Sequence, residues 1–292
     1  MTTISSIRRP PAALASFRSS VREADLGWSH YTAAGFLLVL TAMAVLAPWI
    51  APYPPTEQNL DTLLQSPSAV HWLGTDDTGR DIVSRIMYGA RMSLFGSCFA
   101  GAIALLIGMP IGLVAGTVGG RVDMILMRVV DAMLSFPAVI LALAVVGALG
   151  PGIIQAMFAI GIVYSPRLAR LLRAQAKSVA VKDYVEAARL SGLSSTAVMI
   201  RHVLPNSLRP IFVQWFLMLS FAFLAEAGLS FLGLGIQPPD ASWGHMLSRA
   251  YRVMSTAGWQ IIAPATAIAL TVLSLNQVGD AVSRWFNKGI TE

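Results

Sequence analysis

No residue between Asp131 and Arg167 carries a charge, and this run is far longer than one membrane crossing requires. A helix needs about 20 apolar residues, at about 1.5 Å each, to cross a bilayer, so the run is too long for one crossing, and Gly150-Pro151-Gly152 divides it into two predicted helices. The whole chain is 55% apolar and 12% charged, whereas soluble domains have about 25% charged residues. This composition excludes a disordered segment, a disulfide scaffold and a free-standing cytosolic enzyme, and it predicts an all-α membrane protein.

Further charge-free windows bring the predicted number of membrane-spanning helices to six, which places both termini on one side. The windows are Ala33–Ala51, Met92–Gly120, the two halves of the Asp131–Arg167 run, Pro210–Glu226 and Met254–Gly279. The expected segments are an N-terminal tail (1–30), a first spanning helix (31–52), an outer loop with an interfacial helix (53–91), a transmembrane core (92–280) that includes a cytoplasmic loop (167–209), and a C-terminal tail (281–292).

The basic residues set the predicted orientation. The chain has 21 Lys and Arg residues and a net charge of +6. With the N-terminus inside, internal segments carry three times as many of these residues as external ones, as expected from the positive-inside rule. Both tails are therefore predicted to be cytoplasmic. Because topology explains the charge, a nucleic-acid-binding face is disfavoured.

The outer loop is longer than an ordinary connection, so it is expected to have structure of its own. Its motif residues are Gly74, Thr75, Asp76, Gly79, Arg80 and Asp81. The pattern predicts a helix that begins near Thr78, is capped by Thr75 or Asp76, and lies on the outer interface before the second span. A less favoured alternative is a substrate or metal site built from Asp76, Asp77 and Asp81.

The cytoplasmic loop contains a predicted amphipathic helix, Lys182–Leu190, that ends at Gly192. Tyr184, Ala187 and Ala188 are expected on one face, where small side chains let a partner approach and Glu186 supplies one ion pair. A second amphipathic stretch follows, and Pro205 is expected to break it before the fifth span.

Three charged residues lie within predicted spans. Arg128 and Asp131 are three residues apart and so share a helix face. They are either part of a gate or path, or a self-neutralising pair. Glu226 lies near the outer end of the fifth span, where it is either a structural hydrogen-bonding residue or, less favoured, a cargo contact.

Catalytic and cofactor signals are weak. The four histidines show no metal-ligand spacing, no Ser-His-Asp arrangement can be argued, and a phosphate-binding Gly-x-x-x-x-Gly-Lys-Ser/Thr motif is missing. We therefore expect neither an enzyme nor a bound metal or cofactor.

The cytoplasmic loop carries the main family resemblance. Its pattern is Glu186-Ala187-Ala188, three residues, Gly192, nine residues, His202, one residue and Leu204-Pro205. This pattern resembles the coupling loop of ABC importer permeases, from which His202 departs because Ile is usual there. The run from His71 to Asp81, Asp131 with Phe136-Pro137, and Gly228 to Gly235 are similar to the second permease subunit of the dipeptide, oligopeptide and nickel importers. The tail Ala281–Glu292 lacks the Asp-Pro ending associated with that family.

The resemblance implies a type I, MetI-like permease fold in the bacterial inner membrane. The implied partners are a paralogous permease, two ATPase subunits that bind the ATP, an extracytoplasmic solute-binding protein and the lipid bilayer. It also implies that Asp183, Tyr184 and the motif residues from Glu186 to Pro205 contact an ATPase. An ion-coupled secondary carrier and an intramembrane enzyme are the rival interpretations, and neither explains the spacing from Glu186 to Pro205.

Overall fold

The computed structural model describes residues 27–288, and this part of the chain is helical without any β-strand. The long helices are α2 (Trp28–Ile50), α3 (Ile82–Val118), α4 (Gly120–Leu134), α5 (Ala138–Leu149), α6 (Ile153–Ala180), α9 (Leu204–Phe231) and α12 (Ile262–Lys288). The short elements are η1 (Leu60–Thr62), α7 (Asp183–Leu190), α8 (Ser195–Val198), η2 (Met199–Val203), α10 (Trp243–Arg252), α11 (Met254–Ala257) and η3 (Gly258–Ile261). Residues 1–26 and 289–292, where most of the two predicted tails fall, lie outside the described part.

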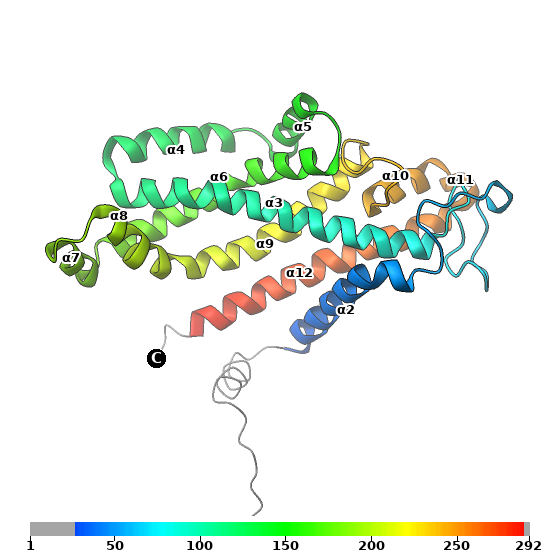
Figure 1. The fold of residues 1–292 in the computed structure, drawn as a ribbon, viewed down its shortest axis with the longest axis horizontal. Coiled ribbons are helices and arrows are strands. Elements are labelled where there is room, and N and C mark those ends of the chain that lie inside the picture. Colours follow the sequence, from blue (N-terminus) through cyan, green and yellow to red (C-terminus); the bar gives the residue numbers. More distant parts are fainter. Residues whose placement is uncertain (1–26, 289–292) are drawn as a thin grey trace, which may run out of the picture.

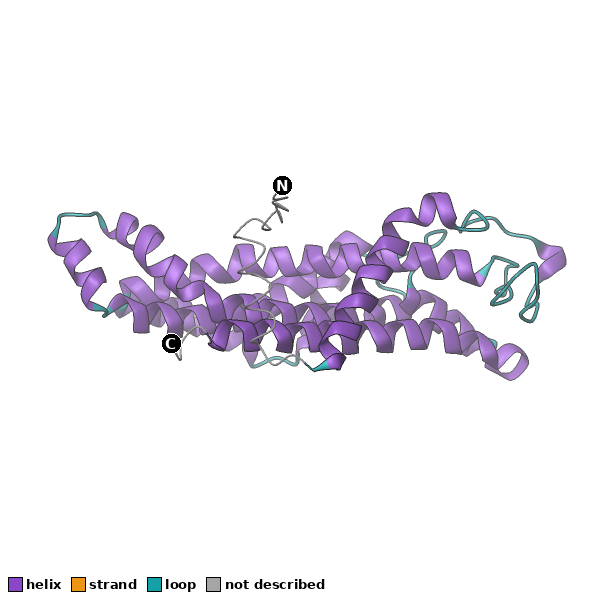
Figure 2. Cartoon of the chain, turned by 90° about the horizontal axis from the view of Figure 1, so that it is seen from below, coloured by secondary structure: helices purple, strands orange, loops and turns teal. Residues whose placement is uncertain are grey.

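Apart from α5, the long helices run roughly along one axis and separate two ends of the molecule. Figure 1 shows α7 and α8 at one end, and the α2–α3 loop with α10 and α11 at the other. The view in Figure 2 shows the same elongated bundle from below. The cytoplasmic and outer loops of the predicted topology are therefore at opposite ends.

Four helical segments in the described part are long and apolar enough to cross a membrane, and the bent pair α4 and α5 raises the number to five. The one remaining predicted span, the second half of the Asp131–Arg167 run, corresponds to α6. Its first half is apolar, but its second half carries Arg167, Arg170, Arg173 and Lys177, which lowers its mean hydropathy. The charge-free window therefore locates only the first half of this helix.

The α4–α5 bend is a feature that the sequence pattern did not predict. The expected straight third helix is two helices that meet at 94° around Phe136 and Pro137. Pro137 has no backbone N–H to donate and precedes the first residue of α5, so the direction of the chain changes there.

Two predicted helix boundaries were wrong. The expected interfacial helix is not separate, because α3 runs without interruption from Ile82, and its cap is Asp81 rather than Thr75 or Asp76. Pro205 does not break the chain, because it lies in the first turn of α9, where its missing N–H costs little. The last helix, α12, continues past residue 281 to Lys288, so the first part of the predicted C-terminal tail is helical.

The α3–α6 pair forms the centre of the bundle and depends on glycines. A Cβ added to Gly108 would lie 2.6 Å from the Ser165 carbonyl oxygen, and one added to Gly112 would lie 2.4 Å from that of Ala169. These separations are too short for any larger residue. The two backbones therefore approach closely, as small residues permit in membrane bundles.

We expect Gly112→Val to lower the stability of the folded chain by about 2 kcal/mol, because the valine overpacks this contact. Gly35→Val on α2 is the matched control, since no atom lies within 4 Å of its added Cβ. Thermal unfolding of both purified variants measures the difference. Equal midpoints for the two variants would contradict the proposed packing.

Candidate functional site

The helix α7 projects from the bundle and presents one face to solvent. Val185 is fully buried and Ala188 is 9% exposed, so these side chains attach α7 to the bundle core. Tyr184, Glu186 and Ala187 are exposed, and Leu190 is 83% exposed. The prediction that Ala188 is available to a partner was therefore wrong, whereas Tyr184 and Ala187 are accessible.

The predicted helix at Lys182–Leu190 is confirmed with a start at Asp183. Gly192 follows it with a φ of 83°, a conformation that favours glycine and redirects the chain after the helix. The exposed Asp183 adds a negative charge to the first turn, where the helix dipole stabilises it.

A continuous helical segment joins this loop to the bundle. Ser194 caps α8 by accepting a hydrogen bond from the Ala197 amide at 3.3 Å, and α8 then passes through a π-helical turn, η2, into α9. His202 lies in this turn, and its carbonyl accepts a hydrogen bond from Asn206 Nδ2 at 2.7 Å. Leu204 packs against the core, while Pro205 is exposed. A displacement of α7 is thus connected to α9 through the short turn at residues 191–194 and the continuous α8–η2–α9 segment.

Glu186 is available for an external ion pair. Its side chain is exposed, and no ion pair engages it or Asp183 within residues 27–288. The Glu186 carboxylate beside Ala187 and Leu190, with Asp183 one turn before it, forms a surface suited to a partner that supplies a cation and an apolar pocket.

At the opposite end, the Asp76 carboxylate organises the outer loop. Its Oδ1 accepts hydrogen bonds from the Thr78 amide and hydroxyl, both at 2.8 Å, and from the Arg80 amide at 3.0 Å. Its Oδ2 accepts one from Arg80 Nε at 2.7 Å and lies 3.6 Å from Arg85 Nε. The Arg80 and Arg85 side chains are almost completely buried.

Burial by itself raises the pKa of Asp76, but the Arg80 guanidinium and the hydrogen bonds from Arg80 and Thr78 lower it further than burial raises it. The net pKa lies below its ordinary value, so this carboxylate remains charged at neutral pH.

The other motif residues also have structural roles. A Cβ on Gly79 would lie 1.8 Å from the Asn59 carbonyl oxygen, and one on Gly74 would lie 2.2 Å from that of Gln65. The buried Thr75 hydroxyl accepts a hydrogen bond from the Gln65 amide and donates one to the Thr62 carbonyl. The motif therefore folds the loop on itself.

The remaining carboxylates of the motif have separate partners. Asp81 caps α3 through the Ser84 amide and lies 3.0 Å from His71 Nδ1. Asp77 pairs with Arg249 of α10 at 2.7 Å. No group of three residues suited to holding a metal ion occurs in the described part of the chain. The side chains are engaged in internal pairs, which disfavours the alternative of a metal site.

The charges of α4 pair with α6 rather than with each other. Asp131 bonds to Arg170, and both side chains are more than half exposed. Asp123 bonds to Arg173 and to Lys177, the latter at 2.7 Å. The predicted alternative of an Arg128–Asp131 pair was therefore wrong, and Arg128 is exposed without an ion pair in the described part. The α6 partners were missed because they are about 40 to 50 residues away in sequence.

Glu226 is 1% exposed and links α9 to α3. Its two carboxyl oxygens accept hydrogen bonds from Ser93 at 2.9 Å and from Ser230 at 2.7 Å. The Ser230 hydroxyl also accepts one from the Ile236 amide at 3.2 Å, so the same network includes the turn after α9. These contacts favour the structural interpretation of Glu226 over a cargo contact.

We expect Glu226→Leu to destabilise the folded chain by about 2 kcal/mol, because Ser93 and Ser230 lose a buried acceptor. Glu226→Gln retains one carbonyl acceptor of the same shape and should lose less than half as much. Thermal unfolding of the two purified variants tests this order, and a larger loss in the Gln variant would reject it.

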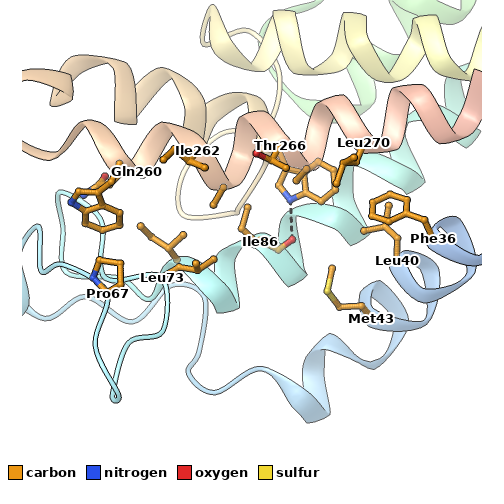
Figure 3. Close-up of a pocket in the computed structure, with 15 residues that line it drawn as sticks. Phe36, Leu40, Met43, Pro67, Leu73, Ile86, Gln260, Ile262, Thr266 and Leu270 are labelled. Atoms are coloured by element: carbon orange, nitrogen blue, oxygen red, sulfur yellow. Dashed lines mark hydrogen bonds between the residues drawn. The ribbon is translucent and has the colours of Figure 1, made fainter. Parts of the chain in front are cut away.

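An apolar cavity of about 480 Å³ opens between α2, α3 and α12 at the end of the bundle that carries the α2–α3 loop. Figure 3 shows Phe36, Leu40 and Met43 of α2 on one side, and Ile262 and Leu270 of α12 on the other. Trp243 Nε1, which lies in this region, donates to the Ile86 carbonyl at 2.9 Å. With this lining the cavity suits hydrocarbon rather than a charged cargo.

Comparisons with known proteins agree with this arrangement. Residues 108–292 match the family described as binding-protein-dependent transport system inner membrane component, and residues 31–67 match the N-terminal transmembrane domain of oligopeptide transport permease C. The di/tripeptide transport system permease protein DppC of Pseudomonas aeruginosa is 43% identical, with 85% of this chain and 84% of the relative covered. The dipeptide permease protein DppC of Alkalihalophilus pseudofirmus is 42% identical, with 84% of this chain and 82% of the relative covered. The glutathione transport system permease protein GsiD of Escherichia coli is also 42% identical, with 86% of this chain and 83% of the relative covered.

Two solved structures share the fold. A chain of the MetNI methionine ABC transporter in an inward-facing conformation superposes with a TM-score of 0.56 at 16% identity, with 70% of this chain and 95% of that chain covered. A chain of an amino acid ABC transporter superposes with a TM-score of 0.53 at 19% identity, with 70% and 94% covered. The fold is therefore the MetI-like fold that the resemblance implied. This chain belongs to the family of binding-protein-dependent transport system inner membrane components, the multi-pass permease subunits of ABC transporters.

Proposed function

We propose that this permease subunit imports short peptides, together with a paralogous permease that completes the translocation path. The observation that carries the proposal is the identity of 42 to 43% with permeases named for dipeptides, di/tripeptides and glutathione, over more than four fifths of this chain. These three cargo classes share a short peptide backbone with at least one carboxylate.

The exposed face of α7 supports a coupling role in this proposal. Two ATPase subunits bind and hydrolyse ATP, and one of them receives Tyr184, Glu186 and Ala187 of α7. Nucleotide-driven closure of the ATPases moves α7, and the continuous α8–η2–α9 segment transmits that movement through the bundle. The chain itself performs no covalent chemistry and holds no cofactor, and a solute-binding protein delivers cargo to the outer end.

This assignment can be tested by growth. Cells that lack the chain and cannot synthesise leucine should fail to grow on Ala-Leu, yet should grow normally on free leucine. A plasmid copy should restore growth on the dipeptide. Growth of the deletion strain on Ala-Leu at the wild-type rate, in a strain without other peptide permeases, would reject the peptide assignment.

The proposed orientation places α7 in the cytoplasm and the outer loop outside. In a Cys98→Ala background, we expect a membrane-impermeant thiol reagent to label Thr62→Cys in intact cells. Ser194→Cys should be labelled only after permeabilisation, because it lies next to α7 at the other end of the bundle. The opposite pattern would invert the topology.

A further inference from the structure

A second cavity, of about 200 Å³, lies between α5, α6 and α9. Ala142 of α5, Tyr164 of α6, and Phe221 and Leu224 of α9 contribute to its largely apolar lining. The Tyr164 and Phe221 rings stack with their centroids 6.5 Å apart. An apolar cavity of about 150 Å³ can bind a benzene ring, so this one has room for one large apolar side chain.

A cation lies beside this cavity. The Arg167 guanidinium carbon is 5.1 Å from the centroid of the Tyr164 ring, and the Arg167 side chain is exposed. Arg167 lies near the middle of α6, about 21 Å along the helix from Ile153. No carboxylate of the described part pairs with it. An unpaired charge at this depth is costly in hydrocarbon, so this face is expected to meet water or an anion rather than lipid tails.

The charge continues toward the cytoplasmic end. Arg170 and Arg128 are also exposed, and the only carboxylate paired with either of them in the described part is Asp131, on Arg170. An excess positive charge therefore lies on the side of the cavity nearer α7, because the three cations Arg128, Arg167 and Arg170 are accompanied by the single anion Asp131. The local field favours an anionic ligand over a cationic one.

We infer that the α5–α6–α9 cavity is a subsite for the transported peptide. It accepts one apolar side chain against Tyr164 and Phe221, while Arg167 binds the C-terminal carboxylate. This inference rests on the proposed function and adds to it a place and a preference. Charge complementarity selects the occupant, because a lipid tail or an apolar helix of the partner permease would leave Arg167 unpaired.

The test uses the complete reconstituted transporter, with its partner permease, ATPases and binding protein. Leu224→Cys in a Cys98→Ala background places one thiol in the cavity lining, and Leu273→Cys on α12 is the exposed control outside it. A charged, water-soluble thiosulfonate should modify Leu224→Cys. Ala-Phe should slow that modification about tenfold, Ala-Phe amide should slow it much less, and neither should protect Leu273→Cys.

Adding Arg167→Gln to the Leu224→Cys protein should abolish the difference in protection between Ala-Phe and Ala-Phe amide. Adding Arg121→Gln, near the start of α4, should leave that difference intact.

Modification of Leu224→Cys by a lipid-soluble maleimide alone would show that the cavity faces lipid. No modification by either reagent would show that the partner permease covers the cavity. Modification without protection would exclude the peptide. Each of these three results overturns the inference. If one of these results is obtained and the wild-type transporter still takes up Ala-Phe, only the subsite is rejected. If the wild-type transporter does not take up Ala-Phe, the proposed function fails as well.

Discussion

Glu186→Lys is expected to abolish both ATPase association and peptide uptake while leaving the folded permease in the membrane. The side chain is exposed on α7, so its replacement removes no internal contact. In the proposed complex, the lysine would place two cations face to face in a desolvated contact. Such an exchange costs several kcal/mol, so we expect at least a hundredfold weaker association.

Co-purification of the ATPase subunits with the tagged permease measures this loss directly. Glu57→Lys makes the same charge change on the exposed outer loop and is the matched control. Glu186→Gln should give an intermediate result, because it removes the ion pair without introducing repulsion. Wild-type co-purification and uptake with Glu186→Lys would refute the docking role of α7.

Asp76→Ala is expected to unfold the outer loop, with a loss of about 3 to 5 kcal/mol of local stability. Arg80 and Arg85 would remain buried, and their nearest carboxylate would be gone. Asp61→Ala is the control, since Asp61 is exposed on the same loop and forms no ion pair in the described part. Trypsin should cleave the purified Asp76→Ala variant after Arg80 within minutes, whereas the wild type and the Asp61→Ala control should resist.

The same contact predicts a dependence on pH. The pKa of Asp76 is lower in the folded chain than in the unfolded one, so its stabilisation is present at neutral pH. This stabilisation is lost as the pH falls through the lowered pKa, and the wild-type loop should then become sensitive to an acid-stable protease. Equal resistance of the variant and the wild type at neutral pH would show that Asp76 does not hold the loop together.

Local chemistry explains which features the sequence could predict. Amphipathic spacing indicates the helix at Lys182–Leu190, and a glycine suited to a positive φ indicates the turn at Gly192. The two signals lie within ten residues of each other in the sequence. The apolar windows likewise depend only on local composition. The family motifs identified the family correctly because their order is retained along the chain.

Tertiary contacts explain what the sequence could not predict. Arg85 made the start of α3 look like an interfacial helix, because nothing in the sequence shows that its charge is buried near Asp76 and bonded to the Pro55 carbonyl. Ala188 is buried only because the bundle core contacts that face of α7. The partners of Asp123 and Asp131 lie on α6, and periodicity cannot reveal which residues of two antiparallel helices meet.

The central claim is that this permease moves cargo only when ATPase subunits drive it. The most direct measurement is the accumulation of radiolabelled dipeptide in proteoliposomes that contain both permeases and the binding protein, with or without the ATPase subunits. We predict accumulation above the external concentration only with the ATPases and ATP. Accumulation driven by a proton or sodium gradient without those subunits would contradict the account.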